Sequence, residues 1–289
     1  MRRIRSHGLL QIASHEQLDG LASLDHQIVE ISREGRLSGS RAGPLYDPGM
    51  PREVMALPQT VGAVTMGQTP RDDIVPELAA ALGEDCQIEQ VGVLDGLSAA
   101  EIESQGHRRG RGRIVTRLRN GEEIRVKSSF LVRQFRECVE DLDGRVDMIL
   151  VLCTGDLLVL KTQVPILYPG RILQSLTQSL GVDRLGVLTP ASGQIRPQRR
   201  RWRGMARWVF VADASPYGPL EAFEEAAERL RRHQVEVVVM DCIGYSRQMQ
   251  QAVRERLDVP VLAALSVLGR VAGEMLGSAD PKLPLSDPD

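Results

Sequence analysis

The 289-residue chain has few cysteines and no long apolar run, and both shortages limit what it can be. Four cysteines are too sparse for a disulfide scaffold in a chain of this length, so we expect reduced thiols and a cytoplasmic protein. No apolar stretch approaches the roughly 20 residues that span a bilayer, and the amino terminus lacks the apolar segment of a secretion signal. We therefore expect neither secretion nor a membrane partner.

An excess charge of one sign and the common catalytic motifs are also missing. The formal net charge is -2 at pH 7, which gives no general attraction to nucleic acid. The sequence has no P-loop, serine nucleophile elbow, metal-binding histidine motif or cysteine pair with zinc-site spacing. What remains is 42% hydrophobic and 26% charged residues, a composition typical of a globular protein with one large or two small cores.

The two ends of the chain differ in pattern from its middle. Residues 1–60 hold one weak helical stretch and then a segment rich in Gly, Pro, Ser and charge, which predicts a flexible N-terminal extension. Met50, Met55 and Met66 leave a misassigned translation start open, although Met66 is a poor candidate because it lies inside an expected strand. Residues 278–289 predict a disordered tail.

From residue 61 onward, short apolar runs alternate with amphipathic stretches. The runs include "VGAVTM", "DMILVL", "RLGVLT", "WVFVA" and "EVVVM". Strands that are apolar on every residue are expected where helices cover both faces of a parallel sheet. The pattern therefore predicts the α/β class.

Two segments of this region resemble one another. "VDMILVLCTG" and "VEVVVMDCIG" share an acidic second residue, a later cysteine and a final glycine without a gap. Upstream, "VGAVTM" and "LGVLTP" each have Gly second and Thr fifth, and downstream "VPIL" matches "VPVL". Three landmarks in the same order predict two similar parallel-sheet lobes related by pseudo-twofold symmetry.

We expect the first lobe to span residues 61–168 plus 265–277 and the second lobe to span 169–264. The interval between the Thr and Cys landmarks is longer in the first lobe, and "RIVTRLRNGEEIRV" lies in the excess. Its Asn120-Gly121 pair predicts the turn of a β-hairpin insertion. Residues 106–113, "GHRRGRGR", predict a loop into this hairpin, and a second role as a lid is left open.

Each repeated cysteine stands at the carboxyl end of a predicted strand. Ligands of open parallel sheets bind beyond these ends, so facing lobes would bring Cys153 and Cys242 into one cleft lined by Thr65 and Thr189. Two thiols on opposite sides of a carbon suit proton transfer, because one thiolate can remove a proton and the other thiol can return one.

The simpler interpretation is that these cysteines only fill space at strand ends, as buried cysteine often does. We interpret Cys86 and Cys138, in predicted helical segments, in that way. The carboxylates of Asp156 and Asp241 would oppose ionisation of the neighbouring site thiols if they lie close and charged.

Three motifs, "TMGQTPRDDIVPEL", "LVLCTGDL" and "VVMDCIGYS", make residues 61–276 resemble the AroM family within the aspartate/glutamate racemase superfamily. The resemblance implies two α/β lobes with the active site between them and catalysis by one cysteine from each lobe, without a cofactor. Carried over by position, Cys153 and Cys242 would be the two acid/base groups. The implied substrate is a small carboxylate.

The residues beside the cysteines depart from the amino-acid racemase pattern. Thr154 and Gly155 stand where Asn-Thr is typical, and Ile243 and Gly244 stand where glutamate racemases have Thr-His. None of the five histidines is placed to support a thiol. Three functions therefore stay open: a racemase or isomerase, a one-cysteine decarboxylase or lyase, and a binding protein without catalysis.

A loop after the first predicted strand could hold a carboxylate through backbone amides, polar side chains and an arginine that pairs bidentately. The expected substrate-binding residues are Thr65, Gln68, Thr69, Arg71, Thr154, Gly155, Thr189 and Gly244. The alternative is that Thr69 caps the next helix, with Pro70, Asp72 and Asp73 in its first turn.

The basic run "RPQRRRWRGMAR", residues 196–207, raises the question of nucleic-acid binding. It contains a single aromatic residue and lies where the second lobe needs its first helix. We interpret it as a solvated helix face and expect no nucleic-acid partner. A homodimer is left open.

Overall fold

The computed structural model describes residues 59–105 and 113–277. Almost all of the expected extension 1–60, the loop 106–112 and the tail 278–289 lie outside the described residues. In the part that is described, no helix is long and apolar enough to cross a membrane.

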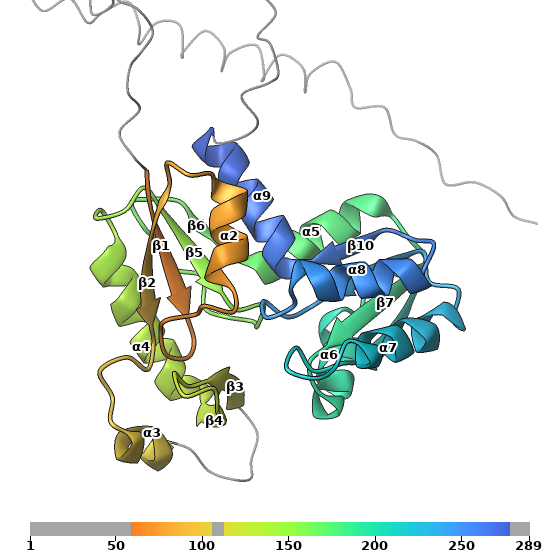
Figure 1. The fold of residues 1–289 in the computed structure, drawn as a ribbon, viewed down its shortest axis with the longest axis horizontal. Helices are drawn as coiled ribbons and strands as arrows, with labels where there is room; N and C mark the ends of the chain where they lie inside the picture. The colour runs from red at the N-terminus through yellow and green to blue at the C-terminus, as the bar shows by residue number, and fades with distance from the viewer. Residues whose placement is uncertain (1–58, 106–112, 278–289) are drawn as a thin grey trace, which may run out of the picture. The chain divides into compact units, whose positions relative to one another are not determined.

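The first lobe is built on a parallel sheet of strand order β2-β1-β5-β6 (Figure 1). Its strands are β1 (Thr60–Thr65), β2 (Gln87–Gly92), β5 (Met148–Leu152) and β6 (Ile166–Leu167). Its helices are α2 (Val75–Leu82), α3 (Ala99–Gln105) and α4 (Ser128–Leu142). β5 is buried at every residue and β1 at all but its first, as a sheet covered on both faces requires.

Between α3 and α4, two strands form a separate antiparallel hairpin, β3 (Arg113–Arg117) and β4 (Glu123–Lys127). The chain reverses at Asn120 and Gly121, where glycine adopts a positive φ of 88°. The Asn120 side chain accepts a hydrogen bond from Glu122 N at 3.0 Å. An Asn-Gly turn suits a hairpin because glycine reaches this backbone conformation without steric cost.

The second lobe is built on a parallel sheet of strand order β10-β9-β7-β8. Its strands are β7 (Arg184–Thr189), β8 (Trp208–Asp213), β9 (Val237–Met240) and β10 (Val261–Ala263). The helices from residue 169 onward are α5 (Pro169–Leu180), the short 3-10 helix η2 (Ser192–Gln194), α6 (Ile195–Arg201), α7 (Glu221–Arg231), α8 (Arg247–Arg256) and α9 (Ala264–Leu276).

The two sheets have the same order when they are compared strand by strand. β1 lies between β2 and β5, with β6 beyond β5, and β7 lies between β8 and β9, with β10 beyond β9. The predicted α/β class with parallel sheets is confirmed by these pairings. The pseudo-twofold axis itself stays a prediction.

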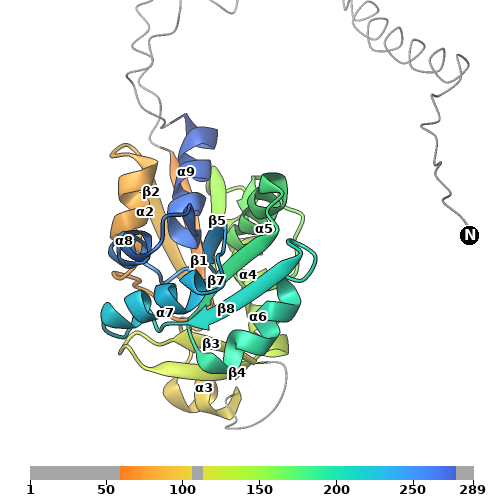
Figure 2. The ribbon, with the colours of Figure 1, turned by 90° about the vertical axis from the view of Figure 1, so that its right-hand side faces the viewer.

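The last helix, α9, packs against α2 near the start of the fold and against α5, and Figures 1 and 2 show it beside α2. Two glycines allow this close approach. A Cβ on Gly269 would lie 2.7 Å from Ala81 Cβ, and one on Gly273 would lie 2.8 Å from Ala81 O. Leu78 of α2 and Leu268 of α9 are fully buried in the same hydrophobic core.

Two details differ from the sequence-based expectations. Helix α2 begins at Val75, so the alternative interpretation of Thr69 as its N-cap is wrong. Thr69 instead bonds to Asp95 in the neighbouring loop, and a turn at Arg71 separates it from the helix. Strand β2 was not among the predicted runs, because its "QIEQVG" sequence carries the polar residues of a half-exposed edge strand.

Candidate functional site

The two cysteines predicted to act together follow corresponding strands of the two sheets. Cys153 comes directly after β5, and Cys242 comes two residues after the end of β9. Both side chains are half-buried. The two loops touch, because Thr154 Oγ1 donates a hydrogen bond to Asp241 O at 3.3 Å. The carboxyl ends of β5 and β9 therefore meet where the sequence predicts a cleft.

Both thiols have raised pKa values, and burial is the main cause. Burial raises the pKa of Cys242 to about 12, the N–H of Gly244 works against that shift, and the charge of Asp241 adds to it. Burial also raises the pKa of Cys153, while the N–H of Gly155, 3.4 Å from the sulfur, and the Arg201 guanidinium lower it. Ionised Cys153 would raise the pKa of Cys242, so the two sulfurs share one electrostatic environment.

Arg201, the last residue of α6, contacts the loops of both cysteines. Its Nε donates to Asp156 Oδ1 at 2.9 Å, and its Nη1 donates to Asp241 Oδ2 at 2.7 Å. Trp202 Nε1 donates to the same Asp241 oxygen at 2.8 Å. Asp241 is fully buried, and its other oxygen has no hydrogen-bond partner among the described residues.

Arg71 places a second buried cation near the thiols. Its Nη1 donates to Thr65 Oγ1 at 2.9 Å, and its Nε and Nη2 donate to the two oxygens of Asp73 at 2.8 and 2.9 Å. Burial alone would lower the pKa of Arg71, but the Asp73 carboxylate outweighs it and raises that pKa. The charge of Arg71 lowers the pKa of both Cys153 and Cys242.

The hairpin reaches the second lobe through Arg117 and Tyr217. The Arg117 guanidinium lies 4.0 Å from the centre of the Tyr217 ring and 3.6 Å from Asp73. Burial raises the pKa of Tyr217, while the charge of Arg71 opposes that shift. Tyr217 therefore lies at the junction of the hairpin, the Arg71 loop and the Cys242 loop.

Gln68 and Thr69, expected to bind substrate, have protein partners. Gln68 Nε2 donates to Leu94 O at 3.3 Å, and its Oε1 accepts from Arg119 N at 3.1 Å. Thr69 Oγ1 donates to Asp95 Oδ2 at 2.6 Å, and Thr69 N donates to Asp95 Oδ1 at 3.0 Å. These bonds fasten the loop after β1 to the loop after β2 and to the hairpin turn. Substrate contact by Gln68 and Thr69 stays a prediction.

The remaining predicted residues occupy different settings. Thr65 and Thr189 are both buried, and Thr189 Oγ1 donates to Gln194 Oε1 at 2.9 Å. Gly155 is exposed beside Cys153. A Cβ on Gly244 would lie 3.7 Å from the Tyr217 hydroxyl, which puts the Cys242 loop in contact with that side chain.

The basic run 196–207 is only partly a solvated face. Arg196, Arg199, Arg200 and Arg203 are exposed, as predicted. Trp202 is fully buried, and the Arg201 side chain is 10% exposed. The solvated-face interpretation is therefore wrong for the pair that contacts Asp241.

Comparison with known proteins identifies the family of the chain. The model of the AroM protein family matches residues 61–276. The chain belongs to the AroM family. No curated protein sequence matches the chain.

Solved structures share the fold at low sequence identity. Allantoin racemase from Pseudomonas fluorescens matches with a TM-score of 0.52 and 16% identity, covering 76% of this chain and 91% of its own. Maleate isomerase from Pseudomonas putida S16 matches with a TM-score of 0.50 and 13% identity, covering 76% of this chain and 93% of its own. This AroM family member therefore shares its fold with an allantoin racemase and a maleate isomerase.

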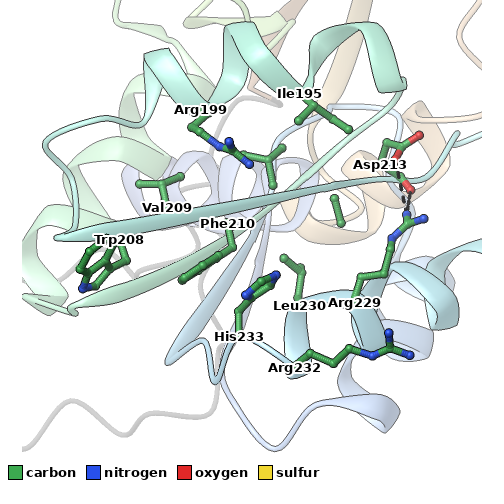
Figure 3. A pocket seen from close by; sticks show the side chains of 12 residues that line it. Ile195, Arg199, Trp208, Val209, Phe210, Asp213, Arg229, Leu230, Arg232 and His233 are labelled. Atoms are coloured by element: carbon green, nitrogen blue, oxygen red, sulfur yellow. Dashed lines mark hydrogen bonds and ion pairs between the residues drawn. The ribbon is translucent and has the colours of Figure 1, made fainter.

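A groove of about 650 Å³ lies elsewhere, along the outer edge strand β8 between α6 and α7 (Figure 3). His233 stacks on Phe210 at 4.2 Å, and Arg229 donates to Asp213 O at 2.6 Å. Neither site cysteine lines this groove. In the described part of the chain, no cluster of three His, Cys, Asp or Glu side chains could hold a metal ion.

Sequence reasoning missed several residues that the structure brings to the site. These residues are Asp73, Asp95, Arg117, Gln194, Arg201, Trp202 and Tyr217. One signal was available, because an Asp stands within three positions of each site cysteine and a buried carboxylate needs a cation. The sequence does not show which of its many arginines supplies it.

Proposed function

We propose that the protein is a racemase or isomerase of small carboxylates in which Cys153 and Cys242 carry the protons. The observation behind this proposal is the meeting of the two cysteine loops, joined at Thr154 and Asp241, at the ends of corresponding strands. One thiolate would take the proton from the carbon next to the carboxylate and become a thiol. The opposite thiol would give its proton to the other face and become a thiolate.

Arg71 is the candidate group for the substrate carboxylate. It is buried near both thiols, and its bonds to Thr65 and Asp73 leave N–H donors on Nη1 and Nη2 for a ligand. A fixed cation also stabilises the negative charge that develops when the carbon loses its proton. The related folds include a protein named for maleate, a small carboxylate.

A one-cysteine lyase or decarboxylase is the second candidate, because the pKa of about 12 keeps Cys242 protonated at neutral pH. When a carbon–carbon bond breaks and CO2 leaves, the electron pair stays on carbon. A protonated thiol could then protonate that carbon and regain its own proton from water. In this reaction Cys153 would have no acid/base role.

Incubation in D2O with a panel of small carboxylates and amino acids tests these proposals. Wild type would be compared with Cys153→Ser and Cys242→Ser, with Cys86→Ser as the control outside the site. Deuterium at the carbon next to the carboxylate, lost in both site variants and kept in the control, supports the two-cysteine reaction. CO2 release that survives Cys153→Ser supports the lyase. Tight binding of one compound without any turnover would overturn both and leave a binding protein.

A further inference from the structure

Arg201 is the one side chain in the described residues that forms ion pairs next to both site cysteines. Asp156, its first partner, follows Cys153 by three positions, and Asp241, its second partner, directly precedes Cys242. We propose that Arg201 is a positioning residue that fixes the two cysteine loops relative to each other. This inference rests on the proposed function, since it assigns a role within the same site.

The two ion pairs of Arg201 differ in strength. The Asp241 side chain is 0% exposed and the Arg201 side chain 10%, whereas Asp156 is 77% exposed. Breaking a buried pair leaves an uncompensated buried charge, while an exposed pair contributes little. Arg201 therefore belongs firmly to the second lobe, together with Trp202, and holds the Cys153 loop through a weaker contact.

Gly170, in the first turn of α5, supports this role independently. A Cβ at this position would lie 2.3 Å from Arg201 Nη2 and 2.3 Å from Thr154 O. Only glycine leaves room there for both the guanidinium and the backbone of the residue after Cys153. The guanidinium is thus confined between the start of α5 and the Cys153 loop.

The charges around Cys153 give the expected direction of the effect. Arg201 and Arg71 lower the pKa of Cys153, and Asp241 raises it. Cys242 faces Arg71, Asp241 and Cys153, and the phenols of Tyr217 and Tyr245 lie near it. Loss of Arg201 would remove a cation from Cys153 and also leave the charge of Asp241 unbalanced.

The test measures alkylation of each cysteine by iodoacetamide as a function of pH, with the modified residues separated by mass spectrometry. In Arg201→Gln, we expect Cys153 to need a pH about one unit higher, which is about a tenfold slower reaction at neutral pH. Arg201→Lys keeps the positive charge but loses the planar, two-pronged geometry of the guanidinium. Its Cys153 profile should therefore lie between those of wild type and Arg201→Gln. Arg200→Gln, an exposed neighbour on α6, should match wild type.

An unchanged Cys153 profile in a folded Arg201→Gln protein, checked by circular dichroism, would overturn the proposal. If that variant does not fold, the pH profile of Cys153 alkylation is measured in Gly170→Ala and Asp156→Asn instead. Wild-type profiles in both variants would overturn the proposal. Alkylation needs no substrate, so its outcome is separate from that of the exchange experiment. A shifted profile in a protein that exchanges no deuterium would sustain the role of Arg201 and reject the proposed reaction.

Discussion

The two lobes have the same strand order but treat corresponding positions differently. In the first lobe, the threonine that ends the opening strand accepts a hydrogen bond from the buried cation Arg71. In the second lobe, Thr189 donates to the neutral side chain of Gln194. The carboxylates near the two cysteines do not occupy corresponding positions: Asp156 follows Cys153 by three residues and is exposed, whereas Asp241 directly precedes Cys242 and is fully buried. A repeated backbone can therefore carry a buried arginine on the threonine of its opening strand in one lobe and a buried ion pair beside its cysteine in the other.

The largest effect is expected from Asp241→Ala. This change leaves Arg201 buried beside Cys242 without its carboxylate, so we expect a loss of about 3–5 kcal/mol in the free energy of unfolding. Asp156→Ala removes the exposed partner of the same arginine and should cost about 0–1 kcal/mol. Urea denaturation measures both. Equal losses in the free energy of unfolding for the two variants would show that Asp156 and Asp241 contribute equally to holding Arg201.

The next effect concerns the loops that follow the opening strands. A Cβ on Gly67 would lie 2.0 Å from Arg117 O in the hairpin, whereas one on Gly193 would meet no atom within 4 Å. Gly67→Ala should therefore cost about 1–3 kcal/mol, because backbone atoms must move to accommodate it. Gly193→Ala should stay within about 0.5 kcal/mol of wild type. Thermal unfolding of the two variants provides the comparison, and a silent Gly67→Ala would contradict the close docking of the hairpin.

Arg71→Gln replaces the charged partner of Thr65 with a neutral glutamine, the residue type that bonds to Thr189 in the second lobe. We expect KM for a carboxylate substrate to rise about tenfold or more, because a charge-assisted contact is worth about 1.5–3 kcal/mol. Gln194→Ala serves as the matched change and should leave KM within about twofold, since it removes no charge. Steady-state kinetics on a substrate found by deuterium exchange would measure this. A larger change of KM in Gln194→Ala than in Arg71→Gln would indicate that the substrate carboxylate binds in the second lobe instead.

The smallest effect is expected in alkaline stability. The pKa of Cys242 is raised from 9.0 to about 12, so the folded chain keeps this proton at pH values where the unfolded chain loses it. Stability from the thiol form is complete below pH 9 and falls as the pH rises, by less than about 1.4 kcal/mol between pH 9 and pH 10. Cys242→Ala should flatten this decline in pH-dependent urea denaturation, and Cys153→Ala should flatten it less, because Arg201 lowers the pKa of Cys153. The reverse order would contradict the assignment of Arg201 to Cys153.

The fold could be predicted from the sequence where strands are buried on both faces. "MILVL" and "VVVM" lie in the centres of their sheets, and burial dictates their composition. Strand β2 lies at an edge, so partial exposure allows the polar residues that hide it from a periodicity argument. The local sequence therefore indicates whether a strand is buried more reliably than it indicates where a strand exists.

For the site, the sequence indicates which backbone positions converge but not which side chains pair. The ends of β5 and β9 carry Cys153 and Cys242 because parallel strands place their carboxyl ends at one edge. The choice of Arg201 as partner depends on the path of α6, since the neighbouring arginines Arg199, Arg200 and Arg203 of the same basic run remain exposed. Such pairing is decided by tertiary packing, which composition and spacing do not encode.

The packing of α9 on α2 has a consequence for biosynthesis. Leu78 and Leu82 of α2 share a buried core with Leu265 and Leu268 of α9, which are among the last described residues to be translated. Contacts so distant in sequence form late, and an apolar surface waiting for them is exposed to aggregation. The face of α2 that packs against α9 would therefore stay bare during synthesis until α9 has left the ribosome.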